Sequence, residues 1–205
     1  MGLDMYLNKV KRIKNAKLDE LVKLNNYFSW VTRPNKYKDS TISEWTHTEM
    51  EDVNLDLAES YISEYKHRYS AWDKNKEYGY HTLFQQVAYW RKANHIHNWF
   101  VENVQNGTDD CGYYEVTKEQ LEQLLEICIE VRDDSKLIHN SEGEAYIKDS
   151  YTAEELLPTQ SGFFFGSTCY DKWYLEDIRY TIKELRKILK TTDFEHEIVM
   201  YHSSW

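Results

Sequence analysis

The segment YWRKANHIHNWF, residues 89–100, decides how the fold is read, because it carries polar side chains through the middle of an apolar pattern. Placed at steps of about 100° from Leu83, the apolar residues between positions 80 and 105 cover roughly half of a helix circumference. Asn106-Gly107 follows as a typical C-terminal stop. We therefore expect residues 80–105 to form one long, mostly buried central helix.

Four polar residues of this segment fall on or beside the apolar arc. Asn94 and His97 lie inside it, whereas Arg91 and Asn98 lie on its margin. Arg91, Asn94 and Asn98 are spaced i, i+3, i+7, which forms one polar column on a helix. Buried polar groups cost about 1–3 kcal/mol each unless they are hydrogen-bonded. Either Asn94 and His97 bond to the backbone and fasten the helix to the terminal strands, or the column lines a pocket in which Arg91 holds an anion.

The two histidines of the segment do not form a metal site on a helix. Residues two positions apart point about 160° away from each other, so His95 and His97 cannot share an ion. We expect His95 and Trp99 on the opposite side of the helix, together with Lys92. No metal and no cofactor is expected, because the chain has neither a Gly-rich phosphate loop with Lys-Ser/Thr nor a G-x-G-x-x-G motif.

A second candidate element is LPTQSGFFFGSTCYD, residues 157–171. Two glycines flank three phenylalanines, and in an extended backbone Phe164 would face away from the other two. The segment leads into a helix that Thr168 could cap, and free N–H groups at a helix start attract anions. The segment is either a buried aromatic loop or the wall of a pocket beside the Arg91–Asn98 column.

The two ends of the chain have the two-residue period of half-buried strands, at residues 2–8 and 195–202. Residues 112–116 are a third, short strand candidate. We expect the terminal strands to share a small sheet around the central helix, in a predominantly helical α+β fold. Residues 1–205 are expected to form a single domain with a variable acidic and aromatic excursion at about 35–80.

Further helices are indicated by apolar stripes. Residues 18–30 form one such stripe, and Pro34 follows it. Residues 117–131 begin with Thr117, and Gln120 three positions later completes a capping-box pattern. Residues 168–189 form the last predicted helix.

Composition excludes some classes of function. The chain has 25 Lys and Arg against 35 Asp and Glu, a net charge of −10, which disfavours general nucleic-acid binding. It contains no apolar run long enough to span a membrane. The three cysteines are far apart and in no metal-binding spacing, as in reduced cytoplasmic thiols. We expect a cytoplasmic protein without a membrane partner.

Five stretches carry a resemblance to a known family: MGLDMYL, YWRKANHIHNWF, DDCGYYEVT, LPTQSGFFFGSTCYDKWYLEDIRYT and YHSSW. They resemble a family of small proteins of bacteriophages and bacterial genomes, some of which carry an automatic label of phosphoglycerate kinase. The chain resembles no part of a two-domain kinase. The resemblance covers the N-terminal strand and most of residues 80–205. It implies a phage or prophage setting, and therefore the host cytoplasm, but no particular chemistry.

We expect a binding protein with a pocket for a small anionic, nucleotide-derived molecule, used for example to sequester a host defence signal. An arginine, amide side chains and stacking rings suit such a ligand. The expected ligand-binding residues are Arg91, Asn94, His97, Asn98, Thr159, Gln160, Ser161, Phe164, Ser167 and Thr168. Two alternatives stay open: a metal-independent hydrolase or lyase with His97 as general acid and base, and a module that binds a host protein through residues 35–80.

Overall fold

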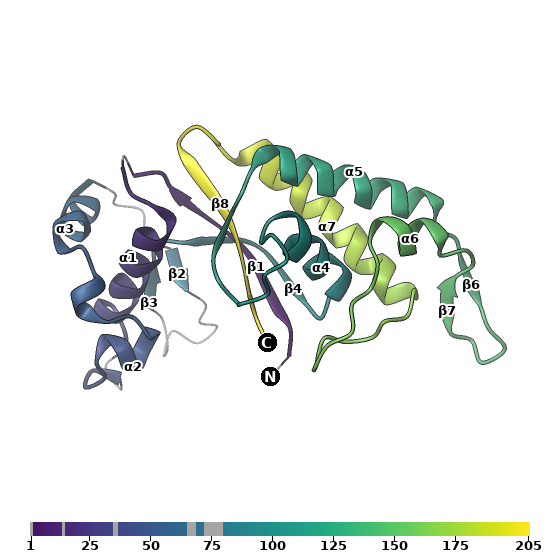
Figure 1. Ribbon diagram of the computed structural model, residues 1–205, viewed down its shortest axis with the longest axis horizontal. Helices are drawn as coiled ribbons and strands as arrows, with labels where there is room; N and C mark the ends of the chain where they lie inside the picture. The colour runs from purple at the N-terminus through teal and green to yellow at the C-terminus, as the bar shows by residue number, and fades with distance from the viewer. Residues whose placement is uncertain (1, 14, 35–36, 65–68, 72–79) are drawn as a thin grey trace. The chain divides into compact units, whose positions relative to one another are not determined.

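The structure, a computed structural model, describes residues 2–13, 15–34, 37–64, 69–71 and 80–205 (Figure 1). The fold is α+β, as predicted. Contacts divide the chain into two compact units, one formed by residues 1–9 and 86–205 and the other by residues 10–85. The predicted excursion at 35–80 falls within the second unit, and its residues 35–36, 65–68 and 72–79 lie outside the described residues; its role in binding a host protein stays a prediction.

A four-stranded antiparallel sheet organises the first unit, and its strand order is β4-β1-β8-β5. The strands are β1 (Asp4–Lys11), β4 (Gln85–Arg91), β5 (Tyr114–Val116) and β8 (Glu197–Ser204). The N-terminal and C-terminal strands are neighbours, which confirms the predicted pairing. β5 pairs with β8 in the register Tyr114↔Tyr201 and Val116↔Val199.

Three helices pack beside this sheet (Figure 1): α4 (Asn94–Asn103), α5 (Lys118–Asp134) and α7 (Lys172–Thr191). Alternate strand residues enter the shared core because successive strand side chains point to opposite faces. The strands and the residue that precedes β1 contribute Leu3, Met5, Leu7, Ala88, Trp90, Val116, Val199 and Tyr201 to this core. The Trp90 indole N–H also donates to Thr181 Oγ1 at 2.9 Å, so a buried hydrogen bond ties β4 to α7.

The prediction of one helix over residues 80–105 is wrong in its first half. Residues 85–91 form the edge strand β4, and a turn at Lys92 precedes the helix at Asn94. Within the strand, Ala88 and Trp90 are buried while Tyr89 and Arg91 are exposed. Short apolar runs fit periods of both 2 and 3.6, and the hydrogen bonds offered by β1 decide in favour of the strand.

The cap of α5 is confirmed and that of α7 is corrected. Thr117 Oγ1 accepts from the Gln120 N–H, and Gln120 returns the bond to the Thr117 N–H. In α7 the capping residue is Asp171 rather than Thr168. Its carboxylate accepts from the N–H groups of Trp173 at 2.7 Å and Tyr174 at 3.1 Å. The helix therefore begins four residues later than predicted.

Smaller elements complete the first unit between α5 and α7. They are the hairpin of β6 (Leu137–His139) and β7 (Ala145–Ile147), and the short helix α6 (Tyr151–Leu156). The Ile147 N–H donates to the Tyr170 carbonyl at 2.9 Å. The hairpin is thus fixed to the segment that leads into α7.

The second unit contains α1 (Leu18–Val31), α2 (Ile42–Thr46), the 3-10 turn η2 (Met50–Asp52), α3 (Leu55–Glu64) and the hairpin of β2 (Tyr69–Ala71) and β3 (Tyr80–Thr82). The predicted helix at 18–30 is confirmed. Asn25, buried on α1, accepts the N–H groups of Leu83 and Phe84 at 2.9 and 3.2 Å. This amide joins α1 to the segment that follows the hairpin.

No helix in the described part of the chain is long and apolar enough to cross a membrane.

Replacing Asp171 by Ala is expected to lower the free energy of unfolding by about 1 kcal/mol, because two N–H groups of α7 lose their acceptor. Asp171→Asn keeps an acceptor oxygen and should lose much less. Urea unfolding followed by circular dichroism measures both. Equal destabilisation by the two substitutions would show that the cap bond is not the source of the effect.

Candidate functional site

Five segments that are distant in the sequence meet at one end of the sheet. They comprise residues 2–3, 92–97, 109–111 and 159–168, together with Trp205, and we call this region the junction. The Lys92 N–H donates to the Leu3 carbonyl at 2.8 Å, and the Leu3 N–H donates to the Phe164 carbonyl at 3.4 Å. Figure 1 shows the two chain ends close to each other in this unit.

The turn after β4 fits closely against the Phe loop, residues 159–168. Lys92 has a φ of 62° and Gly166 a φ of 97°. A Cβ on Gly166 would lie 2.9 Å from Lys92 Cβ and 3.0 Å from the Lys92 carbonyl oxygen. Position 166 therefore requires glycine for two reasons, its left-handed backbone and the close approach of the turn.

Asn94 holds the Phe loop in place. Its Nδ2 donates to the carbonyls of Phe165 at 3.2 Å and Ser167 at 2.8 Å, and its Oδ1 accepts from the Gln160 N–H at 3.0 Å. The side chain is 1% exposed. These three bonds use both amide hydrogens and one acceptor position, so Asn94 positions the loop and does not face a ligand.

The three phenylalanines do not alternate as predicted. The Phe165 N–H donates to the Gly162 carbonyl at 3.3 Å, which makes a turn rather than an extended segment. Phe163 and Phe164 are 81% and 53% exposed, whereas Phe165 is buried. Phe164 has a φ of 63°, and this left-handed residue turns its ring to the same side as Phe163. Two aromatic rings therefore stand in solvent at the tip of a fixed loop.

A hydrogen-bonded chain runs from the core to the surface through His97. Its Nδ1 lies 2.7 Å from the Tyr201 hydroxyl and its Nε2 lies 3.0 Å from Asp109 Oδ2. The Trp205 indole N–H donates to the other Asp109 oxygen at 3.1 Å. The Phe165 ring packs edge-on against both His97 and Trp205. The chain joins α4, β8 and the 109–111 turn to the Phe loop.

Burial determines the protonation states of His97 and Tyr201 in this series of hydrogen bonds. Desolvation lowers the pKa of His97, although the Asp109 carboxylate acts in the opposite direction, and desolvation raises the pKa of Tyr201. A neutral His97 satisfies both contacts if Nε2 donates to Asp109 and Nδ1 accepts from the Tyr201 hydroxyl. Both ring nitrogens are then engaged, and the His97 side chain has no exposed surface.

The predicted polar column does not exist, because its members lie on different elements. Arg91 ends β4 and is exposed, Asn94 begins α4 and is buried, and Asn98 is half-buried on α4. His95 and Trp99, predicted to face away from the buried arc, are only 3% and 5% exposed. Tertiary packing covers both sides of α4.

His95 is buried against α7. Its ring lies 4.1 Å from that of Tyr174, and burial lowers the pKa of His95 to about 3. Its Nε2 atom is buried and has no hydrogen-bond partner among the described residues. The helix surface that the periodicity assigned to solvent is therefore a second packing face.

The loop residues predicted to bind a ligand divide into bonded and exposed groups. Thr159 Oγ1 donates to the Thr168 carbonyl, and Ser167 Oγ accepts the Cys169 N–H. Ser161, Ser167 and Thr168 are exposed. Ser167 and Thr168 do not lie at a helix start as expected, because α7 begins at Lys172 and the Asp171 carboxylate accepts from its N–H groups; their role in binding an anion stays a prediction.

Sequence reasoning missed four residues that build the junction: Lys92, Asp109, Tyr201 and Trp205. The turn containing Asp109 reads as a solvated connection, and Tyr201 reads as an ordinary strand residue. Their role in the junction depends on contacts with residues that are far away in the sequence. The sequence shows an acidic pair beside a glycine turn and a tryptophan at its last position. It does not show that these residues lie close together in the fold.

Three left-handed backbone positions that are not glycine lie in the junction: Lys92, Cys111 and Phe164, with φ values of 62°, 58° and 63°. Such positions cost roughly 1–2 kcal/mol each and persist where the surrounding structure over-determines them, often at functional sites. Their concentration here marks the junction as the candidate functional site of the first unit.

Comparison of the chain with protein-family models, with curated proteins and with solved structures finds no match.

Replacing Asn94 by Ala is expected to lower the free energy of unfolding by about 2–4 kcal/mol, because three backbone groups of the Phe loop lose their partner. The Phe loop should also become sensitive to proteolysis. Asn98→Ala on the same helix is the matched control, since no hydrogen bond of the Asn98 side chain is found within the described residues. Equal effects of the two substitutions would remove the role of Asn94 as a clamp.

Stability is expected to fall as the pH is lowered from about 7.5 to about 5. The folded-state pKa of His95 is below that of the unfolded chain, so the unfolded state takes up a proton first and the folded state loses stability. His95→Gln should reduce this loss by about 2 kcal/mol at pH 5. The exposed His139→Gln is the control. An unchanged pH profile in His95→Gln would contradict the assignment.

Proposed function

We propose that the protein is a binding protein that takes a small, planar, anionic molecule, such as a nucleotide, at the junction. The observation that carries the proposal is the pair of exposed phenylalanine rings on a fixed loop whose Gly166 lies against the side chain of Lys92. Phe163 and Phe164 lie 4.2 Å apart by ring centroids. Exposed aromatic faces are favourable stacking partners for flat rings.

Positive charge is available next to these rings. Arg91 and Lys92 are both exposed, and neither forms an ion pair with any residue that the structure describes. The Lys92 side chain passes Gly2 and Gly166, and Gly2 itself lies near the Phe164 carbonyl. A phosphate or carboxylate held by Lys92 would therefore lie beside the loop that carries the aromatic rings.

Backbone donors complete the proposed site. The N–H groups of Gly166, Ser167 and Thr168 make no hydrogen bond within the described part of the chain, and all three residues are exposed. The Asn94 side chain donates hydrogen bonds to the carbonyls of Phe165 and Ser167 and so fixes this part of the loop. The loop is thus ordered before a ligand arrives, which lowers the entropic cost of binding.

The arrangement of His97 supports binding more than catalysis. A general acid or base must reach its substrate within hydrogen-bond distance. Both nitrogens of His97 are engaged with Tyr201 and Asp109, and the ring is inaccessible. We propose that His97 holds the junction together from inside. In the phage setting that the resemblance implies, sequestration of a host signal molecule is one use of such a site.

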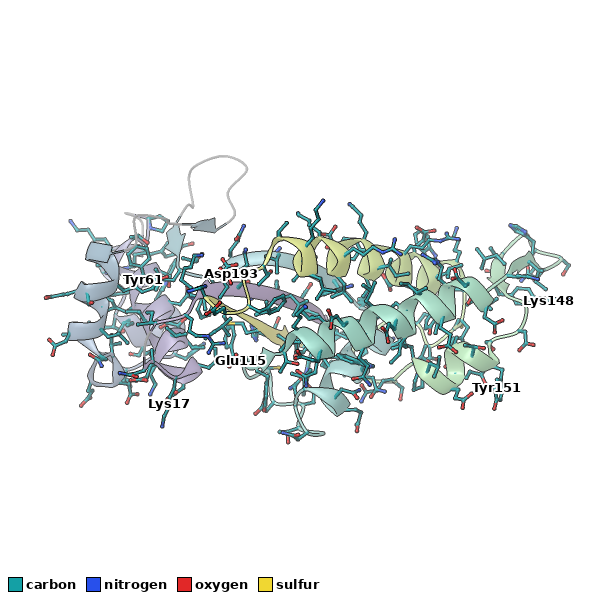
Figure 2. The ribbon with its side chains drawn as sticks, turned by 90° about the horizontal axis from the view of Figure 1, so that it is seen from above. Lys17, Tyr61, Glu115, Lys148, Tyr151 and Asp193 are labelled. Carbon is teal, nitrogen blue, oxygen red and sulfur yellow. The ribbon has the colours of Figure 1, made fainter. Side chains whose placement is uncertain are left out.

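A panel of nucleoside phosphates and cyclic nucleotides, tested by thermal shift and calorimetry, is expected to contain a binder. Lys92→Gln and Phe164→Ala should each weaken its binding at least about tenfold, equivalent to about 1.4 kcal/mol. Lys148→Gln is the charge-matched control, because Lys148 is exposed in the loop between β7 and α6 and is not a junction residue; Figure 2 shows it at one end of the view.

Whether the bound molecule is recovered unchanged or converted distinguishes a binding protein from an enzyme. Mass spectrometry should recover the ligand unchanged after incubation with the wild-type protein, whereas conversion would favour the hydrolase or lyase alternative. Failure of the whole panel to bind, or equal binding by Lys92→Gln and wild type, would overturn the proposed site.

A further inference from the structure

The outer face of α7 carries a stripe of positive charge, which we call the basic stripe. Its members recur at helical spacing on one face, lie over about 17 Å of helix at 1.5 Å per residue, and are all exposed: Arg179, Lys183, Arg186, Lys187 and Lys190. Only Arg179 and Lys183 form ion pairs within the described residues, and their partners, Glu176 and Glu184, lie on the same helix. The other three cations of the basic stripe form no ion pair within the part of the chain that the structure describes.

α5 carries the opposite pattern, which we call the acidic stripe. Its members are spaced i, i+3, i+7, i+11, i+14 over about 21 Å and are exposed: Glu119, Glu122, Glu126, Glu130 and Asp133. They lie opposite the buried stripe of Leu121, Leu124, Cys128 and Val131. The ion pairs found for this stripe are with Lys118 and Arg132 of the same helix.

The two helices lie side by side, so the two stripes are neighbours. α5 and α7 pack against each other, and the view from above shows both with their side chains directed outward (Figures 1 and 2). Adjacent helix axes are about 8–10 Å apart. No ion pair joins the two helices within the described part of the chain. The unit therefore presents a face that is half acidic and half basic.

We infer that this two-helix face binds the same face of a second copy of the chain. A twofold axis parallel to the helices, lying between them and in the plane of contact, would place the basic stripe of each copy on the acidic stripe of the other. A twofold contact of this kind is self-complementary and closed. Both sets of charges are then matched in one interface.

The side-by-side arrangement favours a second copy over a polyanion. A nucleic acid or another uniformly negative partner that approached the basic stripe would also meet the acidic stripe about 10 Å away, within one Debye length at about 0.1 M salt. The fitting partner must itself alternate in charge across a similar width, and this chain does. The net charge of −10 opposes association, so attraction must come from the local pattern.

The contact is small, which sets the kind of association to expect. Two helices about 10 Å wide and 20 Å long offer about 400 Å² per copy, or about 800 Å² in total, below the 1,200–2,000 Å² typical of stable complexes. The association should therefore be weak, reversible and sensitive to salt. It involves no junction residue, so it stands or falls independently of the proposed ligand site.

Sedimentation velocity over a range of protein concentrations tests the inference with two charge-reversal proteins. In the basic-stripe variant three cations become acidic: Lys183→Glu, Arg186→Glu and Lys187→Glu. In the acidic-stripe variant three acids become basic: Glu122→Lys, Glu126→Lys and Glu130→Lys. A control with the same charge change as the acidic-stripe variant replaces three exposed acids elsewhere in the unit: Glu142→Lys, Glu155→Lys and Glu195→Lys. All of these positions are exposed, and circular dichroism verifies that each variant folds.

Wild type and the control are expected to associate at about 20 mM salt and to dissociate at about 500 mM, where screening shortens the range of the charges. Each stripe variant alone should be monomeric, because its two helices then carry like charge. Mixing the two variants should restore association as a one-to-one complex. Wild type that is monomeric at every concentration in low salt would overturn the inference, as would a mixture that stays monomeric. Binding of a labelled RNA oligonucleotide that is lost in the basic-stripe variant would assign the face to a polyanion instead.

Discussion

The adjacency of the first and last strands is the constraint on which the first unit depends. β1 lies between β4 and β8, so residues almost the full length of the chain apart are neighbours in the sheet. Closing so large a loop is entropically costly, and the buried faces of Met5, Leu7, Val199 and Tyr201 offset that cost by removing apolar surface from water. Once the strands pair, the two chain ends are brought to one edge, and the junction can form there.

The junction is stabilised by the side-chain hydrogen bonds of Asn94 and His97. Asn94 fixes the Phe loop from the start of α4, and His97, one turn later, joins Tyr201 of the last strand to Asp109 and, through it, to Trp205. A buried polar group left without a partner costs more than a bonded one contributes. These residues therefore specify one arrangement of the loops, while Lys92, Phe163, Phe164, Ser167 and Thr168 are exposed to solvent.

The side chains that hold the site together therefore differ from those that would contact a ligand. In the sequence, His97 and Asn94 are candidates for ligand binding. In the structure both are buried, and their side chains form hydrogen bonds within the protein. Lys92 was not predicted to bind a ligand and Phe164 was, and both are exposed residues with left-handed backbone conformations. On the outer faces of the helices, α5 carries the acidic stripe and α7 carries the basic stripe. The packing of the unit does not depend on this separation of charge.

The sequence alone determined the α+β class, the pairing of the terminal strands, the helices at 18–30 and 117–131, and the Thr117 cap, because each of these follows from local periodicity or from side chains within one turn. It also showed that Asn94 and His97 are buried. Only the tertiary structure decided that residues 85–91 form a strand, that Asp171 rather than Thr168 caps α7, and that Asn94 meets the Phe loop. Those outcomes depend on hydrogen bonds between segments far apart in the chain, and no local pattern encodes which distant partner a residue will meet.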